Sequence, residues 1–134
     1  MIHLDTSFLV DLLRDAQRKQ AGPASRLLVE IADEELTVSV FVVCELMAGV
    51  DLSRRPSAER ERVADLLEGL EVAYPGTEFA TAYGRLFADL ERSGQRLAAM
   101  DHLIATSALV DGAALATADS DDFSRVPRLD VLSY

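Results

Sequence analysis

The sequence predicts an α/β fold in which a mainly parallel β-sheet is flanked by α-helices. Short apolar runs of strand length alternate with longer amphipathic segments along the whole chain. A helix between consecutive strands favours parallel pairing, because a parallel connection needs a long crossover. The length of 134 residues fits one domain, residues 1–134, and there is no repeat, low-complexity tract or linker.

The first half of the chain begins with a buried strand at residues 2–4. Apolar side chains at helical spacing then predict a helix over residues 7–14, followed by a polar loop over residues 15–22. Pro23 suits the first turn of the next helix, and residues 36–38 form a second strand. These elements give a strand-helix-helix-strand order.

A third helix is predicted after Ser39, which is a favoured N-cap residue. We expect its inward face to consist of Val40, Val43, Met47 and Val50. The neighbours of Cys44 are apolar, so the only cysteine of the chain is expected to be a buried free thiol in a reducing cytoplasm.

The second half continues the alternation. Helices are predicted from Ser57, over residues 78–93 and over residues 101–110, with a short strand at residues 71–74. The chain closes with a small-residue strand, a turn and a last strand, at residues 113–117, 119–123 and 129–132.

The formal net charge of −10 argues against binding nucleic acid by charge alone, since that requires neutralisation of phosphates by Lys and Arg. It fits a protein that concentrates carboxylates and needs cations. No apolar run approaches the ~20 residues of a membrane span. We therefore expect a cytoplasmic protein with no membrane partner.

Four acids stand where a solvated charge is not the default. Asp5 ends the first strand, Asp119 follows the strand at residues 113–117, Glu45 lies in an apolar helix and Asp101 begins another. Ligands of open α/β sheets gather beyond the carboxyl ends of the strands, so Asp5 and Asp119 are expected at one edge. Simpler interpretations remain for each: a helix cap for Asp5 or Asp101, a turn for Asp119 and an exposed position for Glu45.

Clustered carboxylates repel one another, and a hard divalent cation resolves that repulsion. Mg²⁺ and Mn²⁺ prefer oxygen ligands and can assist hydrolysis of a phosphodiester. The two histidines, His3 and His102, are expected to be structural rather than ligands.

Four segments together resemble the PIN-domain proteins of the VapC ribonuclease toxin family: residues 2–7 (IHLDTS), 39–46 (SVFVVCEL) with Gly49, 100–105 (MDHLIA), and 115–119 (LATAD) followed by Asp122-Phe123. The resemblance covers the chain from end to end. It implies a single PIN domain, Mg²⁺- or Mn²⁺-dependent cleavage of RNA, a homodimer and a VapB-type antitoxin as partner.

Carried over position by position, the acidic quartet of the family matches Asp5, Glu45, Asp101 and Asp119. Its hydroxyl positions near the site match Thr6, Ser7 and Thr117. The family often has Asn at the position of Asp119, and Asp122 is a second candidate for the fourth acid.

Other classes also place an aspartate after the first strand. Haloacid-dehalogenase-like phosphatases have a second Asp two residues on, where this chain has Ser7, and both they and response-regulator receivers need a lysine that Lys19 does not match. A non-catalytic PIN-like binding module, or a PIN nuclease of RNA processing outside a toxin–antitoxin pair, stays open as an alternative.

Overall fold

Five short parallel strands form the centre of the molecule in the computed structural model, which describes all residues 1–134. Their order is β3-β2-β1-β4-β5, and every neighbouring pair is parallel. The strands are β1 (Ile2–Leu4), β2 (Leu36–Ser39), β3 (Glu71–Ala73), β4 (Ala114–Ala116) and β5 (Val131–Leu132). The predicted parallel α/β fold is confirmed.

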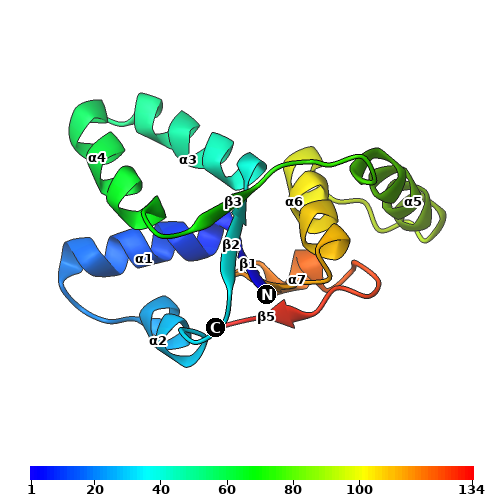
Figure 1. The fold of residues 1–134 in the computed structure, drawn as a ribbon, viewed down its shortest axis with the longest axis horizontal. Coiled ribbons are helices and arrows are strands. Elements are labelled where there is room, and N and C mark those ends of the chain that lie inside the picture. The colour runs from blue at the N-terminus through cyan, green and yellow to red at the C-terminus, as the bar shows by residue number, and fades with distance from the viewer.

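Helices cover both faces of the sheet. They are α1 (Thr6–Arg18), α2 (Pro23–Glu30), α3 (Val40–Leu52), α4 (Pro56–Leu67), α5 (Phe79–Arg92), α6 (Ala99–Val110) and α7 (Ser120–Phe123). In Figure 1 the sheet is seen nearly edge-on, with α1, α2 and α4 on one side and α5 and α6 on the other. One continuous apolar core of 23 buried residues joins the two layers to the sheet.

The chain changes direction at β1. From β1 it builds outward through β2 to β3, then crosses back to add β4 and β5 on the other side of β1. The carboxyl ends of β1 and β4 therefore flank a point where the strand order reverses, which is where open α/β sheets hold their ligands. Asp5 follows β1 there, and Thr117 follows β4.

Three local predictions are wrong. Helix α1 continues to Arg18, where a loop was expected, because the polar residues of its last turn face solvent and need no apolar spacing. The buried face of α3 consists of Val42, Leu46 and Val50, whereas Val40, Val43 and Met47 are only half-buried. Cys44 is exposed, not buried.

The error in α3 has one cause. This helix is apolar on nearly every side, so helical periodicity in the sequence does not select a face.

The predicted cap is confirmed, because the Ser39 hydroxyl accepts the Val42 backbone N–H at 3.3 Å. The expected turn at residues 119–123 is a single helical turn, α7.

Candidate active site

Asp5 is almost fully buried at the end of β1, with 2% of its surface exposed. It occupies the N-cap position of α1, yet its carboxylate accepts no backbone N–H of that helix. Two hydroxyls hold Oδ2 instead: Ser7 Oγ donates at 2.8 Å and Thr117 Oγ1 donates at 2.7 Å. The capping interpretation of Asp5 is therefore wrong, and its carboxylate is fixed by Ser7 in the first turn of α1 and by Thr117 after β4.

The same hydroxyls organise the chain after β4. Ser7 Oγ accepts the backbone N–H of Ala118 at 3.0 Å, and Thr117 Oγ1 accepts that of Asp119 at 2.9 Å. Thr117 is completely buried. Ser7 and Thr117 thus join Asp5 to the segment that carries Asp119.

Glu45 reaches the site from α3 and is half-buried. Thr6, the first residue of α1, donates its hydroxyl to Glu45 Oε1 at 2.6 Å. Each of the two buried or half-buried carboxylates, Asp5 and Glu45, is therefore oriented by a hydroxyl at the start of α1.

Asp101 lies in the first turn of α6 and is half-buried. Burial raises its pKa to about 6, and the neighbouring charges of Asp5, Glu45, Asp119 and Asp122 act in the same direction. The four other carboxylates consequently lie close enough to Asp101 to oppose its ionisation. The structure brings together the acids that the sequence singled out.

Asp119 stands at the surface before α7, and its side chain makes no cap bond. Partial loss of hydration raises its pKa, with further contributions from the charges of Asp5, Asp122 and Asp11. Asp122 forms an ion pair with Arg125 at 3.5 Å, whereas Asp119 has no such partner.

No basic side chain pairs with Asp5, Glu45, Asp101 or Asp119, although five other carboxylates of the chain form ion pairs with arginines. No three acidic, histidine or cysteine side chains converge tightly enough to enclose an ion by themselves. This donor set fits Mg²⁺ better than a fully dehydrated ion, because Mg²⁺ keeps several waters and takes only one or two carboxylates directly.

Sequence reasoning missed Asp11 and Tyr134. Tyr134 donates its hydroxyl to Asp11 Oδ2 at 2.7 Å and packs edge-on against Phe8, with ring centroids 5.3 Å apart. Burial, and then the bond to Asp11, raise the pKa of Tyr134. Nothing local in the sequence distinguishes Asp11 from an exposed helix residue, so only the fold could reveal it.

Both histidines are packed in the interior. His3 is buried and bonds to Asp111 through Nε2 at 2.7 Å. His102 packs against Tyr83 and Phe87, and burial lowers its pKa.

Comparison with known proteins gives one family. The model of the PIN domain matches residues 2–129. A curated relative, Ribonuclease VapC2 of Rickettsia felis, is 30% identical over 94 residues, which is 70% of each chain. Ribonuclease VapC1 of Haemophilus influenzae is 27% identical over 126 residues, covering 94% of this chain and 92% of the relative.

Solved structures agree with this. The VapBC2 complex of Rickettsia felis, solved with a DNA fragment from its promoter, contains a chain that superimposes with a TM-score of 0.87 at 27% identity, over 100% of this chain and 99% of that one. A chain of the DNA-bound VapBC of Salmonella typhimurium also gives 0.87, at 23% identity, over 98% of this chain and 96% of that one. At that identity the second likeness concerns the fold. None of the helices is long and apolar enough to span a membrane.

Proposed function

This chain belongs to the PIN-domain family of VapC ribonucleases. We propose that it hydrolyses RNA phosphodiester bonds at the site formed by the four acids, with the help of Mg²⁺ or Mn²⁺. The observation that carries the proposal is the set of four neighbouring acids without a basic partner. Asp5, Glu45, Asp101 and Asp119 would hold the ion, directly or through water. Thr6, Ser7 and Thr117 would keep the first two acids and the Asp119 segment in place.

A bound divalent ion supplies charge stabilisation at the phosphoryl oxygen and an acidified water. The chain's own contribution is to fix the ligands before the substrate arrives. Asp5 needs no movement, since two hydroxyls already hold it. Asp101, with a pKa of about 6, is mostly ionised at neutral pH and can serve as a ligand or take a proton from water.

For the fourth acid we favour Asp119 over Asp122. Asp122 is already engaged by Arg125, whereas Asp119 has no cationic partner and follows the segment that Thr117 anchors. Asp122 would then act on the site only through its charge.

We further propose a VapB-type antitoxin as partner and a homodimer as the assembly. Relatives of this chain were solved as VapBC complexes. A guanidinium pairs with carboxylates in bidentate fashion and stays charged at physiological pH, so an antitoxin arginine is suited to enter the acidic site. The net charge of −10 would speed the encounter with a basic segment.

The test is cleavage of a mixed RNA substrate by the purified chain freed of any antitoxin. We expect cleavage with Mg²⁺ or Mn²⁺, none with a chelator, and recovery when the ion is restored. Asp119→Ala removes every oxygen ligand at that position and should lower the rate by more than about 100-fold, and Asp122→Ala by far less. RNA binding without cleavage under every metal condition would show a binding module instead.

A further inference from the structure

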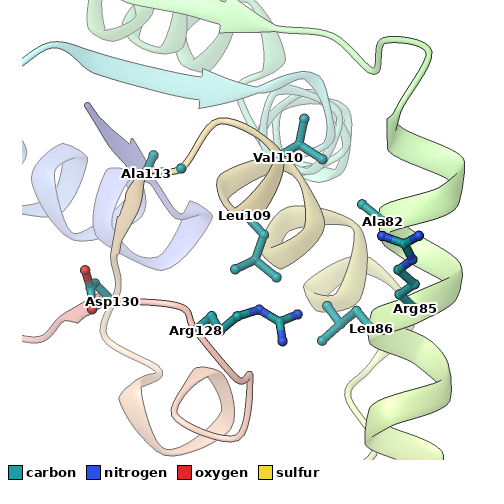
Figure 2. A pocket seen from close by; sticks show the side chains of 9 residues that line it. Ala82, Arg85, Leu86, Leu109, Val110, Ala113, Arg128 and Asp130 are labelled. Atoms are coloured by element: carbon teal, nitrogen blue, oxygen red, sulfur yellow. The ribbon is translucent and has the colours of Figure 1, made fainter.

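A hollow lies beside the amino ends of β4 and β5, at the opposite end of these strands from the carboxylates. It has a volume of about 340 Å³ and opens beside Gly112 and Ala113, which precede β4, and Asp130, which precedes β5. Its apolar walls come from α5 and α6: Ala82, Leu86, Leu109 and Val110. Figure 2 shows Arg128 reaching from the loop before β5 toward α5, where Arg85 stands above Leu86.

This hollow gathers arginines that have no partner. Arg85 and Arg128 also border an adjoining hollow of about 640 Å³, together with Arg92. None of the three makes an ion pair or a side-chain hydrogen bond, whereas five of the twelve arginines of the chain pair with carboxylates. Three of the seven unpaired arginines thus share one place in a protein of net charge −10.

The nearby acids do not neutralise them. Asp130 lines the first hollow, but its side chain points away from the guanidinium of Arg128 (Figure 2). Asp89 borders the second hollow without pairing with any of the arginines. Two guanidiniums facing one space without a counter-charge repel each other, and a bound anion would remove that repulsion.

The backbone of Arg128 has an unusual conformation. Its φ is 67°, in the left-handed region that side chains with a Cβ rarely adopt. No side-chain bond of Arg128 stabilises this conformation. Non-glycine residues held in this region cluster at ligand sites as well as at helix ends such as that of Lys19. Arg128 caps no helix, and its side chain extends over the hollow (Figure 2).

We infer that this hollow binds a nucleotide phosphate, carried either by a free nucleotide or by the backbone of an RNA chain. Arginine recognises phosphate oxygens in bidentate fashion, and the apolar wall formed by α5 and α6 offers contact for a ribose or base. The volume lies within the range of small-ligand sites, roughly 300–1,000 Å³. Because the hollow is at the amino ends of β4 and β5, it is distinct from the carboxylate site.

The experiment measures binding in the presence of EDTA, so that neither a metal ion nor cleavage contributes. The probes are AMP and a short oligouridylate, titrated into the full chain. The double variant Arg85→Gln/Arg128→Gln should bind about tenfold more weakly or worse. The matched control Arg54→Gln/Arg55→Gln removes the same charge from a distant loop and should bind within about twofold of wild type.

The two probes separate the sources of the phosphate. Equal affinity for AMP and the oligomer identifies a free nucleotide, and binding of the oligomer alone identifies RNA backbone. The inference fails if neither probe saturates, or if the control variant loses as much affinity as the double variant. Failure here leaves the proposed nuclease activity untouched, because that activity is measured with metal present.

One further variant separates a ligand role from a structural one. Arg128→Gly removes the side chain and relieves the left-handed backbone. We expect it to melt at a higher temperature than wild type and to lose binding of the probe. A glycine variant that binds as tightly as wild type would overturn the assignment of Arg128.

Discussion

At the scale of single residues, the clearest sign of function is a carboxylate that does not stabilise its own helix. Asp5 stands at the N-cap of α1, where accepting a backbone N–H would stabilise the helix by about 1 kcal/mol. Its buried carboxylate is instead held by Ser7 and Thr117. The carboxylate is therefore held in a fixed position at the expense of a cap bond that would stabilise α1.

Thr117 tests how much that arrangement depends on one hydroxyl. Thr117→Val keeps the shape but removes the donor to Asp5 and the acceptor of the Asp119 N–H, so we expect a loss of about 1.5–3 kcal/mol in the free energy of unfolding. RNA cleavage should fall with it. The control is Thr106→Val, because Thr106 is equally buried and bonds only to the His102 carbonyl. Denaturant unfolding that shows the same loss for both variants would contradict the role given to Thr117.

Asp101 predicts a dependence on pH. Its pKa in the folded protein is raised from 3.8 to about 6, so the stability that its neutral form contributes is complete below pH 4 and is lost as the pH rises through about 6. Asp101→Asn is always neutral. In EDTA this variant should therefore melt at a higher temperature than wild type at pH 7, and at nearly the same temperature at pH 4.

The measurement is a pair of thermal melts at each pH. An equal difference between the two proteins at pH 4 and pH 7 would show that burial and the acidic neighbours do not raise the pKa of Asp101. With Mg²⁺ at pH 7 the advantage of the variant should shrink, because a cation relieves the same repulsion in wild type.

At the scale of elements, the sequence predicted the strands well and the inward face of α3 poorly. Each strand is a short apolar run between breaks, and the parallel sheet follows from the helices between them. Helix α3 is apolar nearly all round, so its burial depends on how α1, α4 and α6 pack around it, which the sequence does not contain.

This difference yields a matched pair of variants. Val42 is completely buried and its neighbour Val43 is half-buried. A change from Val to Ala alters helix propensity equally at both positions, so the pair isolates the effect of burial. Val42→Ala should reduce the free energy of unfolding by about 1–2 kcal/mol more than Val43→Ala does. Equal losses in denaturant unfolding, or a larger loss for Val43→Ala, would contradict the buried face of α3 that the structure shows.

The gathering of the acids was predictable in part from the order of the strands. Asp5 and Asp119 follow strands, and parallel strands place their carboxyl ends at one edge. Glu45 and Asp101 stood out by their apolar helices, but no rule of the sheet places an acid on a helix, so the family resemblance was needed to group them with Asp5 and Asp119. The contact between Asp11 and Tyr134 was not predictable, since it depends on where the residues after β5 lie in the fold.

At the scale of the whole molecule, charge is divided between the two ends of the sheet. Unpaired acids gather near the carboxyl ends of β1 and β4, and three of the seven unpaired arginines border the hollows beside the amino ends of β4 and β5. A basic partner should therefore dock at the first edge and an anionic one at the second.

This division predicts how an antitoxin inhibits. Co-expression with the product of the neighbouring gene should give an inactive complex, and replacing one arginine of that partner by Gln should restore cleavage. If no single arginine matters, and the complex binds Mn²⁺ as the free chain does, the arginine does not occupy the acidic site.

Mn²⁺ binding shows whether the four acids form one metal site. Electron paramagnetic resonance of added Mn²⁺ counts bound ions without requiring an RNA substrate. Asp5→Asn should weaken binding by more than about tenfold and abolish detectable cleavage while the fold persists. The control Asp51→Asn, at an exposed ion pair with Arg60, should bind like wild type. An Asp5→Asn variant that binds Mn²⁺ and cleaves RNA as wild type does would show that these acids do not form the metal site of a nuclease.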